Sequence, residues 1–419
     1  MKHLFILCLV SLFQVISLIT VSAQCITCNN TNTYAGTTAG ANLVQINGGN
    51  NNGIDNSFFG RTTGNRVTTG DANSLFGKDA GRNIISGSHN SIFGSYAGDV
   101  NSASQNSFFG AFSGYNNLKG VGNSFFGYEA GRANLGGSNN SFFGHSAGLA
   151  NNTGANNSFY GTGSGAFNTE GFSNSFFGRF SGRKNTTGDE NSFFGHEAGD
   201  ANTSGSQNVF MGRYAGRFHR TGNRNVFLGT AAGELYNGSR NTLIGFGAGN
   251  TTSGSNNIMI GTNAGPSGFV TVNNLLYIHN ASTNLPLIYG DFSNQEMIVN
   301  GTLEVTGGNS VASSRTKKKG FVNINEAEVL SKISDMDLQE WSYINHPDQR
   351  HIGPIAEDFY AAFGLGKNDK TITTTDMSGV ALVAIQALEK ENNTVKESLK
   401  EMTYLINKMN DRLQKLEEK

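Results

Sequence analysis

The sequence predicts a mostly β protein with a repetitive parallel β-solenoid, or β-roll, shaft, a small α+β domain and a C-terminal α-helical coiled coil, assembled as a homotrimer. An Asn-Ser-Phe-Phe-Gly-like motif recurs thirteen times, every 16 or 17 residues, which is typical of a solenoid. Apolar residues near the C-terminus follow heptad spacing. Glycine supplies 56 of 419 residues but proline only 4, which suits a turn-rich chain with uninterrupted backbone ladders.

Residues 1–23 have the features of a secretory signal peptide. A polar start precedes an apolar run over 4–20, and Val21-Ser22-Ala23 is a small-residue cleavage site. A membrane anchor is the alternative, but the run is short and no basic flank follows it. No other apolar stretch is long enough to span a bilayer. We therefore expect a secreted or cell-surface bacterial protein with no membrane span after signal removal.

The next segment, 24–52, carries a CxxC motif formed by Cys25 and Cys28. A redox role would need a helix N-terminus in an α/β domain, which the surrounding sequence does not supply. A disulfide within or between chains is the expectation for an exported protein. The net charge of −1 gives no general attraction to nucleic acid. No metal or cofactor is expected anywhere in the chain.

Residues 53–265 form the thirteen repeats, and we expect each to be one coil of two short strands joined by Asn- and Gly-rich turns. At about 4.8 Å per coil the stack is roughly 60 Å long. Adjacent apolar residues such as Phe125-Phe126 point to opposite faces of a strand, so both faces should be buried. Side chains on one face of each strand would fill the interior of the coil. The other face would be covered if three parallel chains packed about a common axis. Two-sheet packing within one chain is the alternative.

The repeats over 56–265 resemble the head of trimeric autotransporter adhesins, most closely in NVFLG, NTLIG and NIMIG. A glycan-cleaving solenoid would need two carboxylates close together. No carboxylates occupy the same repeat position on adjacent coils. The array is therefore interpreted as a scaffold and display surface.

Residues 266–310 alternate polar and apolar side chains in LLYIHN, PLIYGDF, EMIVNG and TLEVTG, which predicts a neck of short strands. Residues 383–419 predict a coiled coil. Nine of its seam residues are apolar, and the polar one, Asn392, would fix the register of the helices. The ten seam positions are Ile385, Leu388, Asn392, Val395, Leu399, Met402, Ile406, Met409, Leu413 and Leu416. A single amphipathic helix packed on its own domain is the alternative.

Residues 311–382 contain ASSRTKKKG at 312–320, HIGPIAEDF at 351–359 and the start of GVALVAIQAL at 379–388. Together these motifs resemble the intramolecular chaperone and auto-processing domain of endosialidase-type phage tail spikes. The resemblance implies a domain that trimerises, helps the upstream fibre to trimerise, and then cuts itself off before a serine with a serine–lysine dyad.

The family motif places the lysine five residues after the serine, as Ser313 and Lys318 are placed here. Cleavage would then fall between Ala312 and Ser313. Here Ser314 and Thr316 replace the family's Asp and Arg. The competing alignment puts Ala312 at the nucleophile position and gives an inactive site. His351 is a candidate helper of the dyad, or a structural histidine.

The sequence thus predicts an exported homotrimeric, adhesin-like fibre whose C-terminal domain promotes assembly and can cut itself once. The partners expected are further copies of the chain and an unidentified cell-surface or glycan receptor, with no nucleic acid. The alternatives are a secreted enzyme acting on polysaccharide and a structural surface protein with an uncleaved trimerisation foot.

Overall fold

The computed structural model describes residues 32–42, 53–306, 313–344 and 346–417. The chain divides into two compact units, one ending at Leu303 and the other beginning at Glu304. The predicted signal peptide, Cys25, Cys28 and Ala312 lie outside the described residues.

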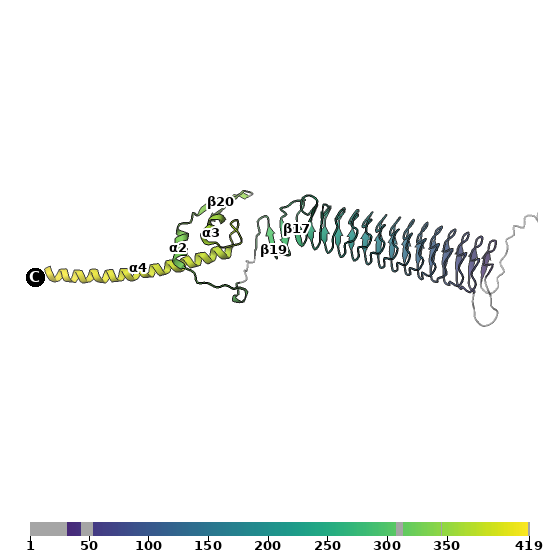
Figure 1. The fold of residues 1–419 in the computed structure, drawn as a ribbon, viewed down its shortest axis with the longest axis horizontal. Coiled ribbons are helices and arrows are strands. Elements are labelled where there is room, and N and C mark those ends of the chain that lie inside the picture. Colours follow the sequence, from purple (N-terminus) through teal and green to yellow (C-terminus); the bar gives the residue numbers. More distant parts are fainter. Residues whose placement is uncertain (1–31, 43–52, 307–312, 345, 418–419) are drawn as a thin grey trace, which may run out of the picture. The chain divides into compact units, whose positions relative to one another are not determined.

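The first unit is a parallel β-solenoid in which each coil contributes one three-residue strand to a single long sheet (Figure 1). Neighbouring strands are in exact coil register, as in the pairing of Phe125 with Phe142. The fold class predicted from the repeats is confirmed. The strands are β1 (Thr33–Ala35), β2 (Ser57–Phe59), β3 (Ser74–Phe76), β4 (Ser91–Phe93), β5 (Ser107–Phe109), β6 (Ser124–Phe126), β7 (Ser141–Phe143), β8 (Ser158–Tyr160), β9 (Ser175–Phe177), β10 (Ser192–Phe194), β11 (Val209–Met211), β12 (Val226–Leu228), β13 (Thr242–Ile244) and β15 (Ile258–Ile260).

The strand β1 adds a coil that the sequence analysis missed. It pairs in parallel with β2, with Tyr34 opposite Phe58. The segment Asn32-Thr-Tyr-Ala-Gly keeps the asparagine and the glycine of the motif but lacks the Phe-Phe pair. Asn32, Gly36 and Gly40 have the same spacing as the corresponding residues of the later repeats, and this spacing could have identified the coil.

The expectation of two strands per coil is wrong, because the second half of each coil is a chain of turns. We number coil positions from the asparagine that precedes each strand. Position 7 is left-handed in every coil, as at Tyr96 (φ 58°) and Phe180 (φ 57°), and position 9 is a left-handed glycine, as at Gly98 (φ 53°). Two left-handed residues so close together cannot belong to an extended strand.

Position 7 is rarely glycine, so most coils hold an ordinary side chain in a costly conformation. Ala231 (φ 56°) is such a residue, and its replacement by glycine removes the clash between Cβ and the backbone. We expect Ala231→Gly to raise the free energy of unfolding by about 0.5–1 kcal/mol. This is the net gain after subtracting the cost of the extra conformational entropy that glycine gives the unfolded chain. The denaturant midpoint measures this. The neighbouring Ala232→Gly, which deletes a fully buried methyl group, should lower the midpoint instead.

The core of each coil is one apolar side chain at position 3, usually phenylalanine, fully buried as at Phe125 and Phe142. These inner rings stack from coil to coil with centroids 4.8 Å apart. Position 8 is a buried alanine, serine or threonine, as at Ala130, and lies across from the ring. A Cβ at Gly131 would come within 2.5 Å of the Phe125 ring, which explains why the Ala-Gly pair recurs.

Two ladders of asparagine run inside the solenoid, one formed by the first residue of the repeat motif and the other by a residue of the Asn- and Gly-rich turns. At position 1, Asn140 Nδ2 donates to the carbonyl of Gly154 (2.8 Å) and its Oδ1 accepts from the N–H of Asn157 (3.0 Å). At position 12, Asn151 Nδ2 donates to Oδ1 of Asn134 (2.6 Å). These side chains are fully buried, and each satisfies backbone groups that turns leave without partners.

The predicted neck continues the sheet. Strand β17 (Leu275–Ile278) is parallel to β15, and β18 (Ile288–Asp291) and β19 (Glu296–Val299) follow as antiparallel strands. A separate pair joins β14 (Thr252–Ser253) to β16 (Val270–Thr271). The fourth predicted segment differs, because residues 302–306 form no strand.

The second unit contains η1 (Arg315–Lys317), α2 (Glu326–Ser334), a hairpin of β20 (Gln339–Tyr343) and β21 (His346–Gly353), α3 (Ala356–Phe363) and α4 (Thr374–Glu417). Its buried apolar side chains are few: Phe359, Val380, Ala384 and Ala387. Helix α2 packs on α4. The single 44-residue helix α4 spans both the GVALVAIQAL motif and the heptads. Within the described ranges, no helix is both long and apolar enough to cross a membrane.

Candidate functional site

The structure brings Ser313 and Lys318 into contact. Lys318 Nζ donates a hydrogen bond to Ser313 Oγ at 2.8 Å. The short helix η1 folds the chain back between them, and Ser314 caps this helix by accepting from the N–H of Thr316 (3.3 Å). The geometry therefore matches the alignment with a lysine five residues after the serine.

The segment around this pair is rich in cations. Arg315, Lys317 and Lys319 are exposed, and none of them is ion-paired with a carboxylate in the described part of the chain. A lysine can accept a proton from a serine hydroxyl only in its neutral amine form. Ser313 and Lys318 are both exposed in the single chain. The single chain therefore leaves the pair open to solvent.

His351, the predicted helper, belongs to a different cluster. Its ring stacks on Trp341 with centroids 4.8 Å apart and lies 5.4 Å from the Tyr343 ring, all within the β20–β21 hairpin. The described contacts of His351 are with these rings and not with Ser313 or Lys318. Its buried Nε2 has no partner among the described residues, nor does the buried Nε1 of Trp341.

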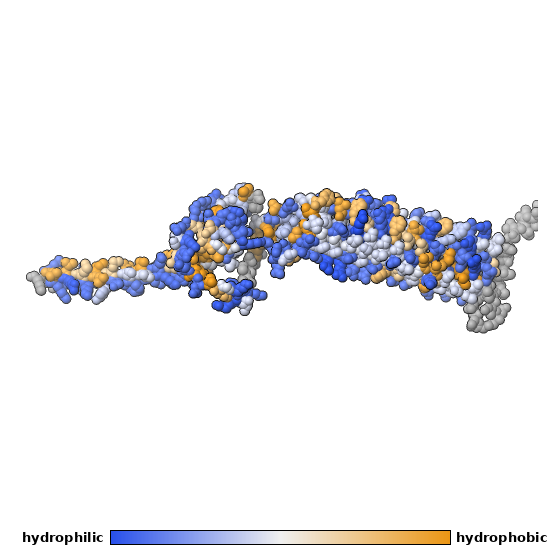
Figure 2. Space-filling model, viewed as in Figure 1, coloured by the Kyte–Doolittle hydropathy of each residue, from blue (hydrophilic) through white to orange (hydrophobic). Residues whose placement is uncertain are grey.

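The predicted seam of α4 is exposed along its whole length. Its nine apolar residues are between 53% and 70% exposed. Apolar surface follows one side of the long helix in Figure 2, and hydrophilic surface the other. An apolar stripe of this length on an isolated helix is rare in water without a partner. The single chain therefore leaves this apolar stripe uncovered.

A second apolar surface follows the outer side of the solenoid strands at position 4. The rings from Phe59 to Phe194 stack in one continuous ladder, with centroids 4.6–4.8 Å apart. Met211, Leu228, Ile244 and Ile260 then extend the ladder. These side chains are half-buried or exposed, whereas the inner ladder is fully buried. Within one chain, therefore, the inner face of the strands is buried and the outer face is not fully covered.

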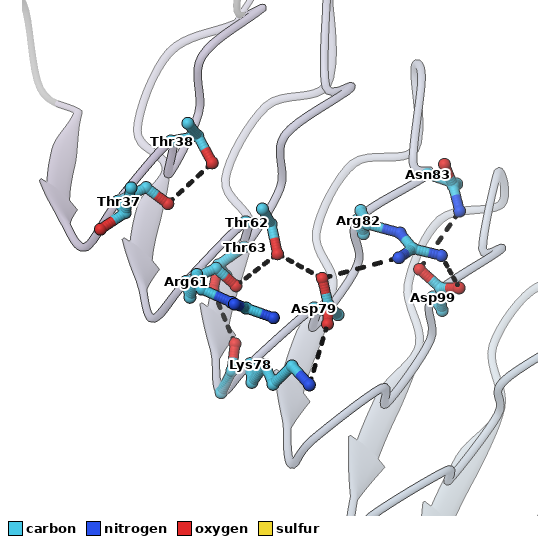
Figure 3. A network of polar contacts seen from close by, with 11 residues as sticks. Thr37, Thr38, Arg61, Thr62, Thr63, Lys78, Asp79, Arg82, Asn83 and Asp99 are labelled. Carbon is cyan, nitrogen blue, oxygen red and sulfur yellow. Dashed lines mark hydrogen bonds and ion pairs between the residues drawn. The ribbon is translucent and has the colours of Figure 1, made fainter.

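Two carboxylates near the N-terminal end of the shaft are held by neighbouring polar groups. Asp79 accepts a hydrogen bond from Thr62 and lies 3.7 Å from a guanidinium nitrogen of Arg82, whose other amino group reaches Asp99 at 3.0 Å (Figure 3). Burial raises the pKa of Asp99, and Arg82 opposes that rise. Among the described residues, no three His, Cys, Asp or Glu side chains gather as a metal site requires.

The surface of the coils brings together residues that the sequence analysis did not single out. Position 6 of successive coils places Tyr128, His145, Thr162, Arg179, His196 and Arg213 in one row. Their shared position in successive repeats could have identified them from the sequence.

Comparison with known protein families matches residues 313–364 to the chaperone of endosialidase. No curated protein and no solved structure is detectably similar to the chain. The resemblance that the ASSRTKKKG and HIGPIAEDF motifs suggested is therefore confirmed for these residues. The chain carries a chaperone-of-endosialidase domain C-terminal to a parallel β-solenoid shaft, a combination consistent with a protein of the tail-fibre type.

Proposed function

We propose that the protein is an exported, homotrimeric, adhesin-like fibre located at the cell surface or secreted. Its C-terminal domain drives assembly, and its solenoid is the displayed shaft. The observation that carries the assembly role is the exposed apolar seam of α4. A parallel trimeric coiled coil would bury this seam and align three chains from their C-terminal ends.

We also propose that the assembled domain cuts the chain once, between Ala312 and Ser313. The supporting observation is the 2.8 Å contact between Lys318 Nζ and Ser313 Oγ. Ser313 Oγ attacks the carbonyl carbon of Ala312 while Lys318, as the neutral amine, takes the hydroxyl proton. An ester forms, the C–N bond breaks, and Lys318 returns the proton to the leaving amine of Ser313. Water then hydrolyses the ester.

The test is intact mass spectrometry and a denaturing gel on the full-length protein and on Ser313→Ala and Lys318→Met. The wild type should give fragments ending at Ala312 and beginning at Ser313, and both variants should remain whole. Ser331→Ala and Lys415→Met are matched controls, because they make the same changes at exposed positions elsewhere in the second unit, and both should still be cut.

Light scattering on the same samples separates the two parts of the proposal. A trimeric mass for uncut Ser313→Ala would show that assembly does not depend on cleavage. A wild-type trimer that stays whole would refute the cleavage and leave an uncleaved trimerisation foot. A monomeric wild type would refute the assembly role.

A further inference from the structure

One row of surface residues on the shaft has a distinctive charge pattern. We call it the position-6 row: Tyr128, His145, Thr162, Arg179, His196 and Arg213, on six consecutive coils. Successive members are about 4.8 Å apart, because that is the spacing of neighbouring strands. All six are exposed or half-exposed, and none is acidic. The row is therefore a strip of aromatic, polar and cationic side chains along successive coils.

Its two arginines lie over aromatic rings. The guanidinium carbon of Arg179 is 4.3 Å from the Phe180 ring centroid, and that of Arg213 is 4.4 Å from the Tyr214 ring centroid. Arg213 also donates to the hydroxyl of Tyr214 (2.8 Å). Stacking holds each side chain in place and so lowers the entropy lost when its N–H groups bind an anion.

Neither arginine is neutralised by a carboxylate within the described ranges, because the nearby acids pair with other arginines. Asp200 is held by Arg183 (2.7 Å). Glu197 is held by Arg217 (2.7 Å), and its other oxygen lies 3.6 Å from Nε2 of His196. Arg179 instead faces His196, with 3.3 Å between its guanidinium nitrogen and Nε2. Two exposed cations, two coils or about 9.6 Å apart, are left for an external anion.

The other end of the row is aromatic. Tyr128 is 46% exposed, and its ring stacks on that of His145 with centroids 5.2 Å apart. Exposed aromatic faces of this kind pack against the apolar C–H faces of sugar rings, because both surfaces lose contact with water.

We propose that the position-6 row binds an extended acidic polysaccharide. Sugar rings would pack at Tyr128 and His145, and carboxylate or sulfate groups would pair with Arg179 and Arg213. Nucleic acid fits less well, because the chain has net charge −1 and binding a phosphate backbone requires many cations. This assignment rests on the proposed function only in requiring that the shaft be displayed outside the cell.

The experiment measures binding of the full-length protein to immobilised polygalacturonate, with neutral dextran and duplex DNA as the other probes. The test variant is Arg179→Gln/Arg213→Gln. The matched control is Arg224→Gln/Arg240→Gln, which removes the same charge from exposed arginines at position 17 and at the end of the next coil. The dissociation constant for polygalacturonate should rise about tenfold or more in the test variant and change little in the control. Added salt should weaken the binding.

Three results would overturn the assignment: no binding of the wild type to polygalacturonate at low salt, equal weakening in both double variants, or equal affinity for duplex DNA. Thermal unfolding of each variant verifies that the solenoid is intact. Light scattering on the same samples reports the oligomeric state independently. Loss of the trimer would therefore count against the proposed function, and loss of binding by an intact trimer against the polysaccharide site.

Discussion

Gly127→Ala is expected to break the stacking of two solenoid coils and to lower the free energy of unfolding by about 4 kcal/mol or more. Gly127 has φ of 140°, a region that residues with a side chain almost never occupy. A Cβ there would lie 2.4 Å from the carbonyl oxygen of Gly144 on the next coil. That oxygen belongs to backbone and cannot rotate away, so the coils must separate. Chemical denaturation followed by circular dichroism measures the loss.

Gly136→Ala is the matched control, because it lies in the same coil as Gly127. A Cβ at Gly136 would meet only Cγ2 of Thr153, at an ordinary contact distance of 3.9 Å. We expect this variant to unfold within about 1 kcal/mol of the wild type. Equal stability of the Gly127 and Gly136 variants would mean that the close approach of the coils is not what the glycine is needed for.

The sequence was enough to predict the solenoid because its main constraint is local. The repeat fixes the register, and the Phe-Phe pair fixes one inner and one outer side chain per coil. The turn at position 7 could not be predicted, since residues such as Phe180 and Glu129 have no intrinsic preference for positive φ. Tertiary stacking imposes that conformation. The asparagine ladders were missed for a related reason: Asn151 looks like a loop residue until the neighbouring coil buries it.

The candidate sites also differ in how far they could be predicted from the sequence. The five-residue spacing of Ser313 and Lys318 lies within one segment, so the sequence already placed the two side chains together. His351 is remote in the chain, and only the hairpin shows that Trp341 and Tyr343 are its neighbours. The members of the position-6 row are 17 residues apart and share nothing in the sequence except their phase. Their common charge pattern becomes visible only when the coils are stacked.

Leu399→Asp is expected to convert the proposed trimer into monomers. Leu399 lies in the middle of the α4 seam and is 59% exposed in the single chain. In a parallel trimer the three copies would meet at one level of the seam. The substitution removes about 2 kcal/mol of apolar burial per chain and places three carboxylates together in a low-dielectric layer. Native mass by light scattering should fall to that of one chain.

Tyr404→Asp is the control for this substitution, because Tyr404 is exposed and lies on the face of α4 opposite the seam. It introduces the same charge into the same helix and should leave the trimer intact. If Leu399→Asp also remained trimeric, the outer ladder of the shaft, from Phe59 to Ile260, would have to hold the three chains together by itself. If both variants were monomeric, helix α4 would be responding to the added charge rather than to the loss of its seam. Only dissociation confined to Leu399→Asp identifies the heptad face as the surface that joins the chains.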